Sequence, residues 1–345
     1  MHVTRREFLR AAAGMAGMLG LQTTGLLKLE EALAGSGNPS VIWLQGQGCT
    51  GCSISFLNSI YYAPVDDLLL NKINLEYHPN VMATAGDFAI SAAQVARPST
   101  GELVDMQAEW LQNGQNLNLD LNGDGIVNFV DYALLAKRGY ILVIEGAIPT
   151  GANGGYCEIG GGMSMVDALR IFSRHASQII AVGTCATYGG LPGAQPNPTG
   201  ALGVTAALNY IGQPRPVINI PGCPMHPDWL VGTIIDLLTG TAVTLDSNGR
   251  PTKFYPAQVI HEHCPLRGTE EADILGQSGC LRELGCRGPR THADCHIRKW
   301  NCPAAGKTGV NWCIGAGSPC IGCTEPTFPD GMTPFYRSGG DGGDD

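Results

Sequence analysis

The chain has 345 residues, which is room for two domains, and 44% of them are hydrophobic, which is enough to give at least one domain a sizeable core. Only 15% of the residues are charged, the formal net charge is −9, and no basic stripe interleaved with aromatic residues occurs. A nucleic-acid partner is therefore not expected. The 13 cysteines remain to be explained, by disulfides or by metal.

The N-terminal segment predicts export. Residues 4–10 contain a pair of arginines, a mildly apolar run follows over residues 11–21, and residues 32–34 read Ala-Leu-Ala, the small-residue pattern of a cleavage site. This arrangement is typical of a twin-arginine signal, which carries folded proteins to the periplasm. An amphipathic helix of the mature fold is the alternative, and the arginine pair disfavours it. We expect residues 1–34 to be a signal peptide, too short and too glycine-rich to span a membrane.

The first predicted strand, 40–45, leads directly into a glycine-rich loop that contains Cys49 and Cys52. Open α/β sheets place their ligands where a strand runs into such a loop. A phosphate-binding loop would end in Lys followed by Ser or Thr, and two cysteines occupy the corresponding positions here. A metal cluster is therefore the expected ligand, in preference to a nucleotide.

An Asn-, Asp- and Gly-rich stretch, 118–131, lies within residues 112–138 and predicts a calcium loop. The expected oxygen ligands are Asp120, Asn122, Asp124, the backbone carbonyl of Ile126, and Asp131, with Gly125 at the sharp turn. A helix is expected over residues 129–137. The alternative is a solvated turn, which six matched positions disfavour. The segment resembles a single dockerin repeat, and a lone repeat could stabilise the chain without binding a scaffold.

Further strand-like runs follow at 140–145, 179–183 and 217–220, with a helix expected over 164–175. Strands that alternate with helices predict a parallel sheet. Cysteines stand just beyond the second and third of these runs. Cys185 and Cys223 should therefore join the first two cysteines at the carboxyl edge of one sheet, where four thiolates would form a complete ligand set.

The C-terminal segment, 261–323, holds eight of the 13 cysteines together with His261, and it lacks helix or strand periodicity. Few aliphatic residues are available to form a core there, so disulfides or metal must hold it. The pair Cys320 and Cys323 on a tight turn, and the histidine beside Cys264, favour metal. Zinc explains four ligands, whereas eight or nine sulfur-rich ligands also suit iron–sulfur clusters.

Seven motifs occur in an order that resembles the small, electron-transferring subunit of nickel–iron hydrogenases. They lie at residues 48–53, 145–151, 183–190, 196–200, 221–224, 261–265 and 319–323. The resemblance covers nearly all of the mature chain. It implies a flavodoxin-like parallel-sheet domain, 35–240, an irregular C-terminal domain held together by clusters, 241–330, and a flexible acidic tail, 331–345.

The resemblance also implies three iron–sulfur clusters, whose ligand groups are here called the proximal, distal and medial sets. The proximal set, for a [4Fe–4S] cluster, is Cys49, Cys52, Cys185 and Cys223. The distal set, also for a [4Fe–4S] cluster, is His261, Cys264, Cys280 and Cys286. The medial set is Cys295, Cys320 and Cys323, with Cys313 at a position where many members of the family have proline and a [3Fe–4S] cluster.

The fourth medial thiol favours a [4Fe–4S] centre, with [3Fe–4S] as the alternative. Cys302 is a reserve candidate for the place of Cys295, because its spacing to Cys320 resembles that of other members. His263 is a reserve for His261. We expect Cys157 to be a buried, inert thiol, and His226 and His292 to be ordinary surface or hydrogen-bonding residues.

The implied partners are a nickel–iron hydrogenase large subunit, which carries the hydrogen-splitting site, and a periplasmic multihaem cytochrome c or a membrane electron acceptor. The chain ends without an apolar run, so a soluble periplasmic complex is expected, with membrane association only through a partner. Two other functions stay open. One is the cluster-bearing subunit of a quinone-linked dehydrogenase related to complex I, and the other is a metal-stapled scaffold protein.

Overall fold

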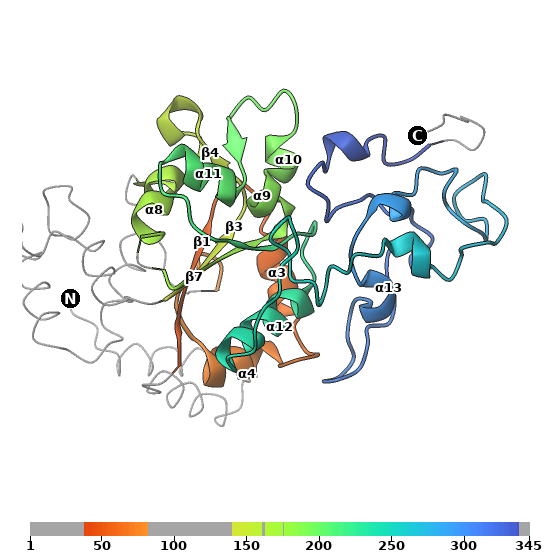
Figure 1. The fold of residues 1–345 in the computed structure, drawn as a ribbon, viewed down its shortest axis with the longest axis horizontal. Coiled ribbons are helices and arrows are strands. Elements are labelled where there is room, and N and C mark those ends of the chain that lie inside the picture. Colours follow the sequence, from red (N-terminus) through yellow and green to blue (C-terminus); the bar gives the residue numbers. More distant parts are fainter. Residues whose placement is uncertain (1–37, 82–139, 161–162, 175, 338–345) are drawn as a thin grey trace, which may run out of the picture.

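The computed structural model describes residues 38–81, 140–160, 163–174 and 176–337 (Figure 1). The predicted signal peptide, the calcium loop with its following helix, and most of the acidic tail lie outside these residues. The described chain forms a sheet flanked by helices, followed by a C-terminal segment of turns and short helices on one side of it (Figure 1).

The main sheet has five strands, all parallel, in the order β2-β1-β3-β7-β9. The strands are β1 (Ser40–Gln45), β2 (Asn74–Tyr77), β3 (Ile141–Glu145), β7 (Gln178–Val182) and β9 (Ile218–Ile220). Numbered along the chain as one to five, they lie in the order 2-1-3-4-5, which is that of flavodoxin-like folds. The predicted α/β fold class with a parallel sheet is confirmed.

The strand register determines where the cysteine-bearing loops begin. Gln45 pairs with Glu145, Glu145 with Val182, and Val182 with Ile220, so the last residues of four strands form one row. The loops that follow these strands therefore leave the sheet at a single edge. This is the physical reason why cysteines far apart in the sequence come together.

The two faces of the sheet bury alternate residues. Val41 and Trp43 face one hydrophobic core, which is covered by α3 (Gly51–Leu57) and α12 (Pro227–Leu238). Ile42 and Leu44 face the other core, which is covered by α8 (Met165–Phe172) and α11 (Val204–Tyr210). Figure 1 shows these helix pairs on opposite sides of the strands.

The predicted helix 164–175 is α8, and Ser164 caps it. Its hydroxyl accepts a hydrogen bond from the Asp167 backbone N–H at 3.1 Å, which satisfies one of the free donors at the helix start. The edge strand β2 and the helix α12 were not predicted. Smaller elements complete the domain: α4 (Val65–Asp67), η1 (Leu68–Lys72), β4 (Ile148–Pro149), η3 (Gly151–Gly154), β5 (Glu158–Gly160), β6 (Met163–Ser164), α9 (Gly183–Tyr188), α10 (Gly190–Gly193) and β8 (Ala201–Leu202).

The C-terminal segment contains only short helical turns, as its lack of periodicity predicted. They are η4 (Ile260–His263), η5 (Gly288–Arg290), α13 (Cys295–Arg298), η6 (Ile314–Ala316) and η7 (Asp330–Met332). Trp312 of this segment, and Phe254 and Tyr255 shortly before it, are buried in the same core as α12. The predicted domain boundary at residue 240 stays a prediction. None of the helices in the described residues is long and apolar enough to cross a membrane.

Buried ion pairs hold the C-terminal segment in place. Arg250 donates to Asp246 at 2.7 Å and to Glu325 at 3.1 Å, and its side chain is almost fully buried. Glu325 follows Cys323 by two residues, so this pair fixes the turn that carries the last two cysteines. Arg298 similarly joins Asp294 at 2.7 Å. Removing one partner of such a pair leaves an uncompensated buried charge, so both pairs specify the path of the chain.

Candidate metal-cluster sites

The fold brings together the four cysteines of the proximal set. Cys49 lies in the loop after β1, Cys52 on α3, Cys185 on α9 after β7, and Cys223 after β9. Electrostatic interactions link the four thiols: Cys185 and Cys223 raise the pKa of Cys52, and Cys49 raises the pKa of Cys185 and Cys223. Four sulfur donors therefore converge at the carboxyl edge of the sheet.

Glycines pack tightly behind these thiols. Gly183 has a φ of +80°, and a Cβ at this position would lie 2.4 Å from the Cys52 Sγ. A Cβ at Gly190, where φ is +51°, would lie 2.8 Å from the Cys185 backbone nitrogen. Only glycine combines these backbone conformations with so close an approach. The backbone thus packs directly against Cys52 and Cys185.

A buried carboxylate supports the proximal set from within the sheet. Glu145, at the end of β3, is 2% exposed and accepts hydrogen bonds from the Cys52 and Ser53 backbone N–H groups at 3.1 and 3.2 Å. The indole N–H of Trp43 and the Ser53 hydroxyl also donate to it. These donors offset the cost of burying its charge and fix the start of α3, on which Cys52 lies.

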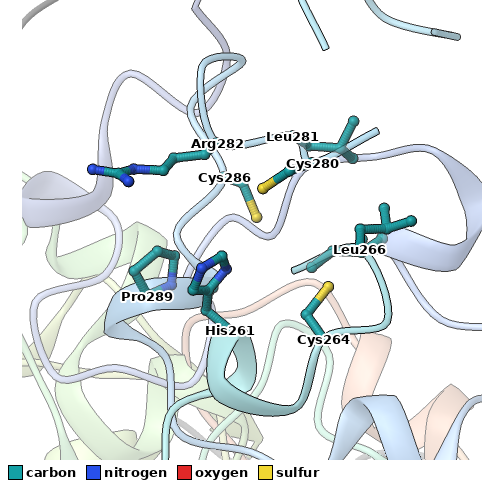
Figure 2. A pocket seen from close by; sticks show the side chains of 10 residues that line it. His261, Cys264, Leu266, Cys280, Leu281, Arg282, Cys286 and Pro289 are labelled. Atoms are coloured by element: carbon teal, nitrogen blue, oxygen red, sulfur yellow. The ribbon is translucent and has the colours of Figure 1, made fainter. Parts of the chain in front are cut away.

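The distal set surrounds a pocket with about 270 Å³ of empty space, part of it open to solvent. Figure 2 shows the sulfurs of Cys264, Cys280 and Cys286 and the ring of His261 facing this common space. Leu266, Leu281 and Ile314 form the aliphatic part of its lining. The pKa of His261 is lowered by partial burial and then by two nearby arginines, Arg267 and Arg282, which favours a neutral imidazole able to coordinate metal.

The medial set also assembles, with Cys313 as its fourth member. Cys295 interacts electrostatically with Cys323, Cys320 and Cys313. Cys323 also interacts with Cys320 and Cys313. Cys295 is the first residue of α13, and Cys313 lies directly before η6. The structure therefore groups the Cys313 thiol with the other three thiols of the medial set.

Cys302, the reserve candidate, lies away from this group. Trp300 and Asn311 are hydrogen-bonded to each other across the base of a loop, at 2.7 Å, and Cys302 lies within that loop. Its Sγ bonds to the backbone oxygens of Ala304 and Lys307 at 2.9 and 2.6 Å. This arrangement favours Cys295 as the medial ligand.

The medial set lies between the other two sets. The Cys320 backbone N–H donates to the Cys286 Sγ at 3.3 Å, which joins the medial and distal loops directly. On the other side, the thiol of Cys323 interacts with that of Cys223 in the proximal set. The three sets therefore follow the order proximal, medial, distal through the molecule.

Burial and mutual repulsion favour the protonated form of Cys52, Cys185 and Cys295 when no cation is present. Burial, followed by the repulsion of neighbouring thiolates, raises the pKa of Cys295 well above the ordinary value and that of Cys185 to about 12. Burial also raises the pKa of Cys52 well above the ordinary value, and repulsion by Glu145 and then by neighbouring thiolates adds to the rise. A bound cationic centre would reverse this balance and displace the protons. Within the described residues, no three His, Cys, Asp or Glu side chains approach closely enough to hold a single metal ion.

The remaining candidates have structural surroundings. His263 does not line the distal pocket and stacks on the ring of His296, with 5.5 Å between ring centroids. Cys157 is half-buried beside the second core. His226 is buried rather than on the surface: its Nδ1 accepts the Asp228 N–H at 3.1 Å, and burial lowers its pKa to about 4. His292 bonds to Glu325.

Comparisons with known proteins agree with this geometry. Residues 49–237 match the family described as NADH ubiquinone oxidoreductase, 20 Kd subunit, and residues 257–336 match the family described as the C-terminal part of the NiFe/NiFeSe hydrogenase small subunit. The periplasmic [NiFeSe] hydrogenase small subunit of Desulfomicrobium baculatum is 36% identical, over 97% of this chain and 99% of its own length. The periplasmic [NiFe] hydrogenase small subunit of Solidesulfovibrio fructosivorans is also 36% identical, over 98% of this chain and 94% of its own.

A solved structure supports the same assignment. The recombinant [NiFeSe] hydrogenase from Desulfovibrio vulgaris Hildenborough in the oxidized state matches with a TM-score of 0.67 and 42% identity, over 89% of this chain and 99% of that chain. The chain therefore belongs to the family of NiFe/NiFeSe hydrogenase small subunits.

Proposed function

We propose that this chain is the electron-transfer subunit of a nickel–iron hydrogenase and relays electrons between a large-subunit active site and an external acceptor. The observation that carries the proposal is the assembly of 12 predicted ligands into three groups that follow one another through the fold. When bound, three iron–sulfur clusters would supply one-electron redox chemistry at these groups. The chain's own thiols and His261 would hold them, and its buried loops would exclude water.

The proximal and distal sets are proposed to hold [4Fe–4S] clusters. Each offers four donors: four thiols in the proximal set, and three thiols with one imidazole in the distal set. The medial set offers four thiols, so we propose a [4Fe–4S] cluster there as well, with [3Fe–4S] as the alternative. His261, at the open distal pocket, would mark the exit toward a periplasmic multihaem cytochrome c or a membrane acceptor.

The test of this function is hydrogen-dependent dye reduction by the chain purified together with its large subunit. We expect hydrogen to reduce the dye and the iron–sulfur centres together. A complex that contains reducible centres but fails to oxidise hydrogen, while it reduces quinone, would favour the alternative of a subunit related to complex I. The match of residues 49–237 to the 20 Kd subunit makes that alternative worth testing, whereas the match of residues 257–336 argues against it.

We further propose export through the twin-arginine route to the periplasm. The relatives named above are periplasmic hydrogenase subunits, and the arginine pair lies in residues outside the described structure. Replacing Arg5→Lys together with Arg6→Lys should leave folded, cluster-loaded protein in the cytoplasm, with the large subunit retained beside it. Fractionation followed by immunoblotting measures this. Unchanged periplasmic activity in the double variant would contradict the proposal.

The calcium loop stays a proposal from the sequence, because residues 118–131 lie outside the described structure. If Asp120 and Asp124 both ligate the ion, Asp120→Ala with Asp124→Ala should abolish calcium binding, since two charged oxygen ligands of one hard cation are lost. Isothermal calorimetry on the cluster-loaded heterodimer gives the answer. Equal calcium affinity in the variant and the wild type would show that these two carboxylates bind no calcium.

A further inference from the structure

Thr184 connects two of the predicted ligand sets through its hydroxyl. It lies between Gly183 and Cys185 at the start of α9, and its side chain is 1% exposed. The hydroxyl accepts the Gly222 backbone N–H at 2.9 Å and donates to the backbone carbonyl of Cys323. Gly222 precedes Cys223 of the proximal set, whereas Cys323 belongs to the medial set.

Thr184 itself is held firmly against the proximal loop. Its backbone N–H donates to the Gly222 carbonyl at 3.0 Å, so two hydrogen bonds join residues 184 and 222 in opposite directions. The third bond, to Cys323, then fixes the medial loop relative to this rigid pair. One buried hydroxyl thus sets the spacing of the proximal and medial ligand loops, and it does so across the 139 positions between Thr184 and Cys323.

The contact that Thr184 supports involves a ligand sulfur. Burial raises the pKa of the Cys323 thiol, and the Cys223 backbone opposes this rise, so this backbone lies beside the sulfur, between the proximal and medial sets. An N–H group directed at a ligand sulfur stabilises the more negative, reduced form of a cluster more than the oxidised form. Hydrogen bonds to sulfur are among the factors that set iron–sulfur reduction potentials.

We propose that Thr184 is a positioning residue that holds the Cys323 loop against the Cys223 backbone and thereby raises the reduction potential of the medial centre. This inference rests on the proposed function. It assigns to Thr184 control over the step from the proximal to the medial set, through the spacing of the two sets and through the Cys223 backbone that this spacing keeps beside the medial sulfur.

Thr184→Val, in the complete heterodimer, tests the inference. The substitution keeps the branched shape but leaves the Gly222 N–H and the Cys323 carbonyl buried without their partner, so the medial loop should relax away. We expect the equilibrium constant for reduction of the medial centre to fall about tenfold, which for a one-electron couple lowers its reduction potential by about 59 mV. A redox titration followed by electron paramagnetic resonance measures this shift. Thr184→Ser, which keeps the hydroxyl, should restore the wild-type potential.

Thr233→Val is the matched control. Thr233 is also fully buried, and its hydroxyl donates to the Trp229 carbonyl at 2.7 Å, but within α12. The medial potential should not change in this variant. If Thr184→Val fails to assemble, Thr184→Ala removes the same hydroxyl without adding a methyl group in its place, and it should lower the potential equally.

The possible outcomes distinguish a failure of the role proposed for Thr184 from a failure of the proposed electron-relay function. A full complement of iron and an unchanged medial potential in Thr184→Val or Thr184→Ala would overturn the role of Thr184 while leaving the relay intact. An equal shift in Thr233→Val would also overturn it, because any buried hydroxyl would then suffice. Wild-type protein without three separate centres would instead overturn the proposed function on which the inference rests.

Discussion

Gly183→Ala is expected to abolish the proximal centre. The new Cβ would lie 2.4 Å from the Cys52 Sγ, a separation that requires the thiol or the backbone to move. Cys52 has little freedom to do so, because its backbone N–H is bound to the buried Glu145 at 3.1 Å. We expect the variant to lose about four irons per chain and all hydrogen-dependent dye reduction, since the entry point of the relay would be lost.

Gly212→Ala separates this clash from backbone strain. Gly212 has a φ of +71°, close to the +80° of Gly183, but a Cβ there would meet nothing within 4 Å. Both variants therefore carry a similar conformational cost, roughly 1–3 kcal/mol, and only one of them collides with a proposed ligand. Iron analysis of the two purified heterodimers compares them. A full iron content in Gly183→Ala would show that Cys52 is not a cluster ligand.

Cys313→Pro should convert the medial centre from [4Fe–4S] to [3Fe–4S]. The backbone of Cys313 has a φ of −52°, which lies within the range that proline imposes, so the substitution should not disturb the turn. It removes one thiolate and its negative charge from the iron core, which should raise the medial potential. Hydrogen oxidation should survive. Electron paramagnetic resonance of the oxidised protein should show a three-iron signal absent from the wild type.

Cys302→Ser is the control for this experiment, because the Cys302 thiol bonds to the backbone of its own loop and is not grouped with the medial thiols. It should leave the spectrum unchanged. Two results would refute the role of Cys313: a three-iron signal at full stoichiometry in undamaged wild type, or no such signal in Cys313→Pro. A medial centre lost in Cys302→Ser would transfer the assignment to that residue.

Much of the fold could be predicted because short apolar runs and glycine-rich loops carry local information. The runs at 40–45 and 140–145 correspond to β1 and β3 within one residue, and the loops beyond the two strands leave the same edge of the sheet. The edge strand β2 was missed because its four residues, Asn-Leu-Glu-Tyr, form too short a pattern to distinguish a strand from a loop.

The supporting residues could not be predicted because their partners are distant in the sequence. Glu145 at the end of a strand gives no sign that it will be buried among donors from residues 43–53, about 90 to 100 positions away. The sequence around Thr184 gives no sign of its role either, because that role depends on two loops that meet only in the folded chain. The choice between Cys295 and Cys302 likewise needed the pairing of Trp300 with Asn311, which directs the intervening loop away.

The central claim is that the chain holds three iron–sulfur clusters in series, and its iron and acid-labile sulfide content tests this most directly. The measurement uses the heterodimer purified without oxygen, with the iron of the nickel–iron site subtracted. Three [4Fe–4S] centres predict about twelve irons and about twelve sulfides in this chain, and a three-iron medial centre would lower the iron count to about eleven. Stoichiometric zinc without labile sulfide would contradict the account.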